Sequence, residues 1–452
     1  MSRTLRADRN HAIVLGGSMA GLLATRVLSD HFGRVSLIER DALPARPEQR
    51  RGVPQGRHTH GLLASGGIVL EKLFPGISEA LLKAGAVTGD IVRDSRWFFE
   101  GACLSRPASG MMGLMMTRPL LEAAVRERVL ANPKIVRRDE LAVEELVVDR
   151  KSGRMTGVRV GGQTLLGDLI VDATGRGSRS PQWLQDLGYT KPVEEVVHIG
   201  LGYTTRFFRR NSTDLNGDTL VVIPPTPKGK RGGVMVAQEG DRWTVTLMAH
   251  FGNYAPENLD GFIAFAKTLP APYIHEVVSC NEPLGEAASA RFPASVWQRY
   301  EKLQRFPAGY LVFGDAICSF NPIYGQGMSV AALQAVELEN TLASSDGDSA
   351  LAKNFFRRAA KVVEIPWATA VGSDLRIPET VGRRTAGVKF VNWYISKLHR
   401  AAYTDPVAAL AFHRVGNLLV PPPSMMHPRV RSGCCGKTCG RRELRLPNWP
   451  WS

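Results

Sequence analysis

The stretch Ala12-Ile-Val-Leu-Gly-Gly-Ser-Met-Ala-Gly21 decides the fold, because it joins a short apolar strand to a helix through a glycine-rich turn. Its first glycine, Gly16, permits the tight turn, and its last, Gly21, permits close packing of the helix on the strand. Ser18 replaces the middle glycine of this pattern and is small enough to let the backbone approach a pyrophosphate. The helix that follows offers free amides and the positive end of its dipole to such an anion.

A βαβ unit surrounds this turn. Leu23 and Val27 share one face of the helix, and residues 35–38 form the next apolar strand. Glu39 ends that strand at about 20 residues from the turn, where an acid binds the ribose hydroxyls of a dinucleotide such as FAD or NAD. The predicted cofactor site here comprises Gly16, Gly17, Ser18, Met19, Ala20, Gly21, Glu39 and Arg40.

Length and composition indicate a globular protein of several units. The chain has 452 residues, of which 44% are hydrophobic and 22% charged, with a net charge of +15. The basic residues are scattered without the interleaved aromatics of a nucleic-acid platform, so we expect no nucleic-acid partner. The arginines and apolar residues at the N-terminus fit a strand, turn and helix better than a secretory signal, and we expect a cytoplasmic protein.

The pattern of elements changes along the chain. Alternating apolar segments between residues 189 and 305 predict an antiparallel substrate-binding sheet, inserted between residues 1–188 and 306–345 of a Rossmann-like FAD-binding domain. Residues 346–430 are expected to form a C-terminal helical region. The predicted class is therefore α/β with an α+β insert.

The end of the chain carries two basic segments. The amphipathic stretch from Arg383 to Arg400 is expected to be a packed helix, with membrane contact as the less favoured alternative. Residues 431–452 are expected to be a disordered basic tail. Its cysteines, Cys434, Cys435 and Cys439, have no second pair of ligands at finger-like spacing, so no metal site is predicted.

Two further motifs favour FAD over NAD. The segments Asp168-Leu-Ile-Val-Asp-Ala-Thr-Gly-Arg-Gly-Ser-Arg179 and Gly314-Asp-Ala-Ile-Cys-Ser-Phe-Asn-Pro-Ile-Tyr-Gly-Gln-Gly-Met328 resemble, in this order, signatures of the para-hydroxybenzoate hydroxylase-like flavoproteins. Asp315 can accept hydrogen bonds from ribityl hydroxyls, and the helix opening after Gly325 can direct its amides at the flavin. The resemblance implies FAD contacts from Asp172, Gly175, Gly314, Asp315, Pro322, Gly325, Gly327 and Met328.

Arg118 begins a predicted helix over residues 117–130. It resembles the arginine with which this family approaches the FAD phosphates and ribityl chain. The alternative is a solvated arginine in the first helical turn.

The segment Arg51-Gly-Val-Pro-Gln-Gly-Arg-His-Thr-His60 adds a narrower resemblance, to bacterial flavin epoxidases of polyether antibiotic biosynthesis. It implies an FAD-dependent monooxygenase of secondary metabolism that transfers one oxygen atom from O2 to an apolar small molecule through a C4a-hydroperoxyflavin, by epoxidation or hydroxylation. The electrons would come from NAD(P)H, directly or through a separate flavin reductase.

His58 and His60 are the candidate catalytic residues. They lie two residues apart and could share one face of a strand, but no third metal ligand is evident. They either line the flavin or substrate region or satisfy loop carbonyls.

Other functions of this fold stay open. They are an alkene reductase or desaturase of the geranylgeranyl reductase type and a flavin-binding protein without turnover. A halogenase is disfavoured, because only Glu364-Ile-Pro-Trp367 approaches the Trp-x-Trp-x-Ile-Pro signature.

Overall fold

A five-stranded parallel sheet forms the centre of the cofactor-binding half. The computed structural model describes residues 9–344, 348–428 and 430. The strands run in the order β17-β11-β1-β2-β7, and every neighbouring pair is parallel. Their bounds are β1 His11–Leu15, β2 Arg34–Ile38, β7 Ile135–Arg138, β11 Leu169–Asp172 and β17 Tyr310–Val312. The predicted α/β class is confirmed, and β17 reaches this sheet from beyond the inserted sheet.

Three helices fix the geometry of the sheet's carboxyl edge. Helix α1 (Met19–Leu28) packs against both α4 (Arg118–Leu130) and α8 (Gly327–Ser344). Leu22 and Leu23 of α1 are fully buried in the main hydrophobic core, and the burial of these apolar side chains stabilises the packing of α1. The shorter helices around it are α2 Ala64–Leu73, α3 Ile77–Lys83 and α5 Ser180–Asp186.

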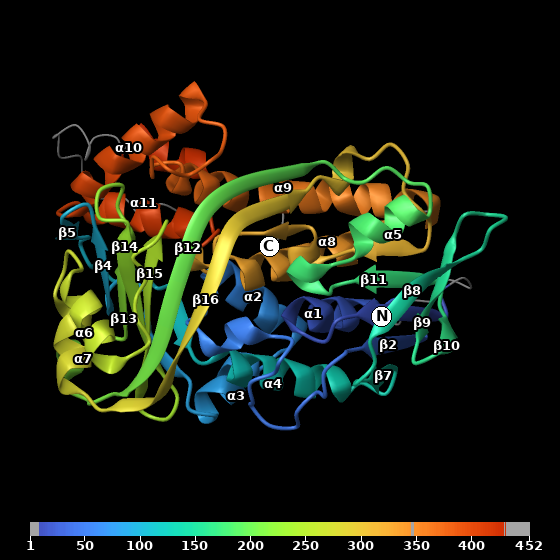
Figure 1. The fold of residues 1–452 in the computed structure, drawn as a ribbon, viewed down its shortest axis with the longest axis horizontal. Helices are drawn as coiled ribbons and strands as arrows, with labels where there is room; N and C mark the ends of the chain where they lie inside the picture. The colour runs from blue at the N-terminus through green and yellow to red at the C-terminus, as the bar shows by residue number, and fades with distance from the viewer. Residues whose placement is uncertain (1–8, 345–347, 429, 431–452) are drawn as a thin grey trace.

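An eight-stranded sheet forms the other half of the molecule. Its two longest strands, β12 (Glu194–Arg209) and β16 (Pro283–Gln298), are antiparallel and connect the two halves of the molecule (Figure 1). The remaining strands are β4 Ser95–Phe99, β5 Ala102–Cys103, β13 Leu220–Ile223, β14 Arg231–Gln238, β15 Arg242–His250 and β18 Cys318–Ser319. Because β4, β5 and β18 come from outside residues 189–305, this sheet is wider than the sequence pattern predicts.

Smaller elements complete these two halves. Helices α6 (Leu259–Lys267) and α7 (Tyr273–Cys280) share a second hydrophobic core with strands of the eight-stranded sheet. Two small sheets consist of β8 Val143–Val148, β9 Met155–Val160 and β10 Gln163–Leu166, and of β3 Val87–Asp90 with β6 Met112–Met115.

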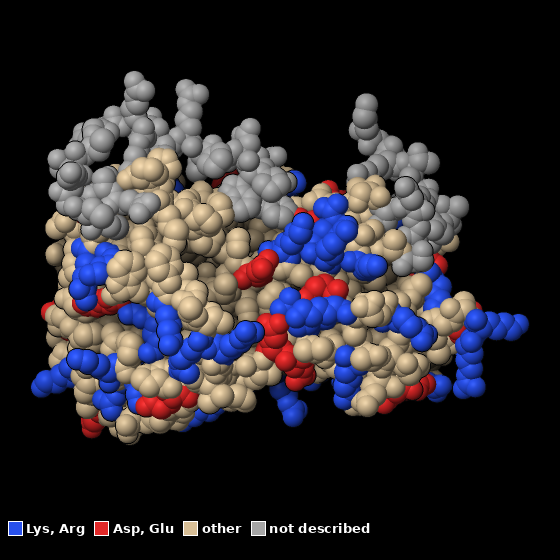
Figure 2. All heavy atoms as spheres, turned by 90° about the horizontal axis from the view of Figure 1, so that it is seen from above, with Lys and Arg blue, Asp and Glu red and all other residues tan. Residues whose placement is uncertain are grey.

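The C-terminal region is helical, as predicted. It contains α9 Asp348–Asp374, α10 Ala386–Ala402 and α11 Pro406–Gly416. Helices α10 and α11 pack together and lie beside β4 and β5 in Figure 1. The predicted tail, 431–452, lies outside the described residues and is drawn in grey in Figure 2. Within the described part of the chain, no helix is long and apolar enough to cross a membrane.

Candidate active site

A cavity of about 1890 Å³ lies between the two sheets and the C-terminal helices. It extends from the Gly16 turn, past the loop at Asp315, to residues of α10 and α11. Binding pockets for single small molecules usually measure about 300–1000 Å³. The cavity is therefore large enough for a dinucleotide and a second molecule beside it.

The glycine turn has the close contacts that its sequence predicts. Gly16 has a φ of +98°, and a Cβ atom there would lie 2.6 Å from the carbonyl oxygen of Ala173. A Cβ atom on Gly21 would lie 1.7 Å from the carbonyl oxygen of Gly16. The backbone amide of Gly17 donates a hydrogen bond to Glu39 Oε2 at 2.7 Å. Only glycine fits at both ends of the turn, and Glu39 is held beside it.

A buried network of charges supports this turn, and two of its members, Arg50 and Glu122, carry no sequence motif. Glu122 of α4 accepts hydrogen bonds from Arg50 Nε at 3.0 Å and from the Ser18 hydroxyl at 3.0 Å. Arg118 donates to the same hydroxyl at 2.8 Å and forms an ion pair with Glu122. Burial alone would raise the pKa of Glu122, but Arg118 and Arg50 outweigh it and lower that pKa below its usual value.

This network excludes one of the two interpretations of Arg118. Its side chain is only 8% exposed, so it is not a solvated surface arginine. It lines the cavity next to Ser18, where its guanidinium can meet a phosphate. The signal that could have identified Arg50 and Glu122 is weak, since Arg50 precedes the motif at Arg51 by one residue and Glu122 follows Arg118 by four.

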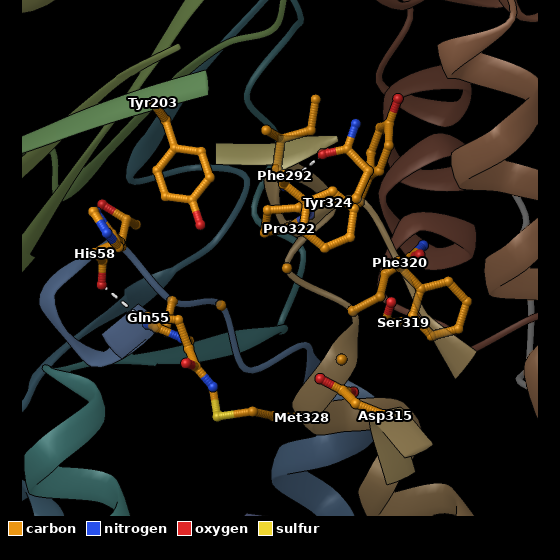
Figure 3. A pocket seen from close by; sticks show the side chains of 18 of the residues that line it. Gln55, His58, Tyr203, Phe292, Asp315, Ser319, Phe320, Pro322, Tyr324 and Met328 are labelled. Atoms are coloured by element: carbon orange, nitrogen blue, oxygen red, sulfur yellow. Dashed lines mark hydrogen bonds between the residues drawn. The ribbon is translucent and has the colours of Figure 1, made fainter. Parts of the chain in front are cut away.

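The loop after β17 brings Asp315 to the cavity. Gly314 has a φ of +69°, and its amide donates a buried hydrogen bond to Gln334 Oε1 of α8 at 2.8 Å. The Asp315 side chain is exposed to the cavity (Figure 3), and partial desolvation there raises its pKa while Arg118 and Arg176 act in the opposite direction. Its carboxylate oxygens bond to none of the described residues, so they can accept hydrogen bonds from a polyhydroxyl chain.

The start of α8 lies in the same wall as Asp315. Gly325 has a φ of +63°, and α8 begins two residues later at Gly327. The first amides of a helix have no intrahelical partner, so they can bind a negative group in the cavity. A Cβ atom on Gly61 would lie 3.2 Å from Gly325 Cα, so the loop after His60 packs directly against the start of α8.

The middle motif has a different role from the one its resemblance implies. Asp172 is fully buried and does not line the cavity. Its carboxylate accepts hydrogen bonds from the Thr174 amide at 2.9 Å and from the hydroxyl of Ser178 at 2.6 Å, as well as from Ser180. Asp172 therefore stabilises the turn and has no free acceptor for a cofactor. Gly175, in the same turn, does line the cavity.

The two candidate histidines both line the cavity. His58 is buried, its Nδ1 lies 2.9 Å from Thr205 Oγ1, and its ring meets that of Tyr203 edge to face (Figure 3). Burial, aided by Arg57, lowers the pKa of His58 to about 4. His60 satisfies the carbonyl of His58 at 3.0 Å, and burial together with Arg118 lowers its pKa to about 3. Both rings are thus neutral near pH 7 and suit hydrogen bonding.

Asp374, at the end of α9, also lines the cavity and carries no sequence motif. Its Oδ1 accepts hydrogen bonds from Asn321 Nδ2 at 2.8 Å and from the Tyr324 hydroxyl at 2.9 Å. Burial raises the pKa of Asp374 to about 7, although these two bonds oppose the shift. The residue therefore anchors the 3-10 turn Pro322–Tyr324 that precedes α8.

The structure brings most of the predicted site residues to one cavity. Four of them, Gly17, Gly21, Asp172 and Gly314, lie behind its wall. The predicted residues that line it are Gly16, Ser18, Met19, Ala20, Glu39, Arg40, His58, His60, Arg118, Gly175, Asp315, Pro322, Gly325, Gly327 and Met328. No cluster of potential metal ligands occurs among the described residues.

The lining residues fit FAD. Open amides and Arg118 near the Gly16 turn suit a pyrophosphate, Glu39 suits an adenosine ribose, and Asp315 suits a ribityl chain. The chain's fold is that of flavin-dependent monooxygenases and halogenases. It is similar to PqsL, a probable FAD-dependent monooxygenase from Pseudomonas aeruginosa (TM-score 0.63, 16% identity, 84% of this chain and 100% of that one).

Two more solved structures show the same fold. The flavin-dependent halogenase CmlS matches with a TM-score of 0.63 and 16% identity, over 91% of this chain and 77% of that one. A flavoprotein/dehydrogenase from Cytophaga hutchinsonii matches with a TM-score of 0.65 and 14% identity, over 94% and 95% of the two chains. These matches show that the chain shares its fold with flavin-dependent proteins.

A closer relationship comes from sequence. No family model matches the chain. It is 36% identical over 440 residues to Protein Rv3254 of Mycobacterium tuberculosis, covering 91% of this chain and 90% of that protein. The chain belongs to the family of Protein Rv3254.

Proposed function

We propose that the protein is an FAD-dependent monooxygenase that transfers one oxygen atom from O2 to an apolar small molecule. The observation that carries this proposal is the continuity of the cavity: the Gly16 turn, Asp315 and the start of α8 face the same space as apolar residues of β13, β14 and α10. Bound FAD would supply the reaction of reduced flavin with oxygen.

The chain's own residues would orient FAD and exclude water. Ser18 and Arg118 would hold the pyrophosphate, Glu39 the adenosine ribose, and Asp315 the ribityl chain. The first amides of α8 would stabilise negative charge on the reduced ring. Neutral His58 would offer a hydrogen bond in the cavity wall without introducing a charge.

The substrate side of the cavity favours an apolar molecule. Its wall includes Leu220 and Val222 of β13, Val234 of β14 and Val391 of α10. These four side chains provide no general base, and an electron-rich alkene needs none to accept an electrophilic oxygen atom. At this part of the wall, which does not include Asp374, epoxidation fits better than hydroxylation of a phenol. NAD(P)H, directly or through a flavin reductase, would supply the electrons.

Isotopic labelling tests this proposal. The purified protein, reduced with NADPH or photochemically, is mixed with 18O2 and a panel of apolar alkenes and phenols. We expect one 18O atom in the product and the other in water. Product that gains two hydrogen atoms without oxygen would make the protein a reductase, and a halogenated product formed with added halide would make it a halogenase. Either result overturns the proposal.

A further inference from the structure

The N-terminal half of α10 projects from the body of the protein. The C-terminal half contains the buried residues Leu398, His399 and Ala402, whereas Phe390 and Trp393 are 53% and 56% exposed. Their rings lie side by side, with centroids 5.8 Å apart. Figure 1 shows α10 at the periphery of the fold. The expected packed helix is therefore only half packed, and two large aromatic side chains face solvent.

The charged residues within this segment of the chain are all positive, and the acid that bonds to α10 from outside it is Glu100, at Ser396 and His399. No Asp or Glu occurs between Glu379 and Asp405, whereas Arg383, Lys389, Lys397 and Arg400 are exposed there. Lys397 lies seven residues after Phe390 and four after Trp393, so it shares their face of the helix.

The base of this projection is held firmly. The Arg384 guanidinium donates hydrogen bonds to four backbone carbonyls, those of Leu375, Ile377, Pro378 and Thr380. The Thr385 hydroxyl caps the helix by accepting a hydrogen bond from the Val388 amide at 3.2 Å. Internal bonds thus position the start of α10, and Phe390 and Trp393 are exposed on an ordered helix.

The cavity reaches the surface beside this helix, as it also does at Arg51 and Arg57. Thr385, Gly387 and Val391 are exposed and also line the cavity, while Val388 and Ile395 lie deeper in its wall. A molecule that enters past Val391 therefore passes the edge of the surface that carries Phe390 and Trp393. The exposed aromatic face and the cavity mouth are parts of one short segment.

We propose that the N-terminal half of α10 binds the surface of an anionic lipid bilayer. Phe390 and Trp393 enter the headgroup region, while Arg383, Lys389, Lys397 and Arg400 contact anionic headgroups. An amphipathic helix with Trp and Phe on one side and Lys and Arg around them is typical of interfacial binding. Each basic residue near such a surface contributes to binding, and salt screens the attraction. The cavity mouth would then face the bilayer, so that an apolar substrate enters from lipid; this last step rests on the proposed function.

Vesicle binding tests the proposal without turnover. The full chain is sedimented with vesicles of phosphatidylglycerol and phosphatidylcholine and, separately, of phosphatidylcholine alone. We expect binding to the anionic vesicles that weakens as salt is raised, and weak binding to the neutral ones. The double variant Phe390→Ser/Trp393→Ser should bind roughly tenfold or more weakly, because both rings lose an apolar environment. The variant Lys389→Glu/Lys397→Glu should not bind.

Matched controls keep the result specific. The variant Ile68→Ser removes a similarly exposed apolar side chain (63%) from α2. The variant Lys151→Glu/Lys191→Glu reverses two exposed charges outside α10. We expect both control variants to bind vesicles like the unaltered protein. An unchanged thermal midpoint in each variant would show that it is folded. Lipids brominated on their acyl chains should quench less tryptophan fluorescence in Trp393→Phe than in the unaltered protein.

Three results would overturn the proposal. They are the absence of binding to anionic vesicles, equal binding by the α10 variants, and a change in oligomeric state in place of lipid binding. The last would assign the surface to a contact between copies of the chain. Failure of the labelling experiment would leave vesicle binding intact, and failure of vesicle binding would leave the labelling result intact.

Discussion

The two ends of the cavity are built in opposite ways. At the Gly16 turn, charged side chains are buried and paired, and the Arg50 and Glu122 side chains are 4% and 5% exposed. At α10, charged and aromatic side chains are exposed, and Phe390 and Trp393 have no covering element among the described residues. The Gly16 end is held in a fixed shape by its buried ion pairs before any ligand binds. The α10 end presents an exposed surface of aromatic and basic side chains.

This difference assigns different tasks to the two ends. Buried and hydrogen-bonded charges need accurate positions, because an unpaired charge in the interior is costly, so the turn can hold a cofactor in one orientation. An exposed helix face has no such requirement and can meet a partner of variable structure. The proposed cofactor site and the proposed lipid contact are consistent with this contrast.

Replacing Gly21 with Val should have the largest effect. The Cβ atom would lie 1.7 Å from the Gly16 carbonyl oxygen, so α1 would have to move away from the strand. We expect no folded, flavin-binding protein, with a loss of about 3 kcal/mol of stability or more. Circular dichroism and flavin absorbance measure this. The control is Gly67→Ala, where no atom lies within 4 Å of the new Cβ. A stable, yellow Gly21→Val protein would show that the turn is misinterpreted.

Glu122→Gln tests the buried charges directly. The change removes the counter-charge that Arg50 and Arg118 share. Arg50 keeps its ion pairs with Glu39 and Asp41. Breaking a buried ion pair typically costs about 3–5 kcal/mol. Urea unfolding should show this loss, and FAD affinity should fall with it. Glu79→Gln removes an exposed pair with Lys83 and should change little. If both variants unfold at the same urea concentration, the network does not stabilise the turn.

Asp374→Asn should change how stability depends on pH. Burial raises the pKa of Asp374 from 3.8 to about 7, so the folded protein retains a proton that the unfolded chain releases. The stability due to this proton is complete below about pH 4 and is lost as the pH rises through about 7.

The variant lacks this dependence. Its free energy of unfolding, relative to the unaltered protein, should therefore rise by up to about 4 kcal/mol between pH 4 and pH 8. Urea unfolding at several pH values measures this difference. A difference that stays constant over the range would mean that Asp374 is ionised in the folded protein throughout.

Residues whose role depends on neighbouring residues in the chain were predicted from the sequence. Gly16 and Gly21 were predicted because both belong to one short turn, and Asp315 because its motif directly precedes a helix. Arg50, Glu122 and Asp374 were missed because their partners are remote in the chain: Arg50 and Glu122 are 72 residues apart, and Asn321 and Asp374 are 53 apart. No local pattern shows such pairs.

The structure departs from the sequence predictions at two places, and both have physical reasons. Asp172 matched a motif, but three hydroxyl groups that follow it in the chain use its carboxylate for the turn. The amphipathic pattern of residues 383–400 gave the helix correctly, yet amphipathicity does not say how much of the apolar side is covered. Only the packing of Leu398 and the exposure of Trp393 distinguish the two halves.

Flavin binding tests the central claim most directly. The flavin released from the denatured protein is identified by chromatography, and FAD affinity is then titrated for the unaltered chain and for Asp315→Ala. We predict FAD, and an affinity loss of about 1.5–3 kcal/mol in the variant, because the ribityl hydroxyls lose a charged acceptor. Release of FMN, a colourless protein that binds NAD, or an unchanged affinity in Asp315→Ala would contradict the account.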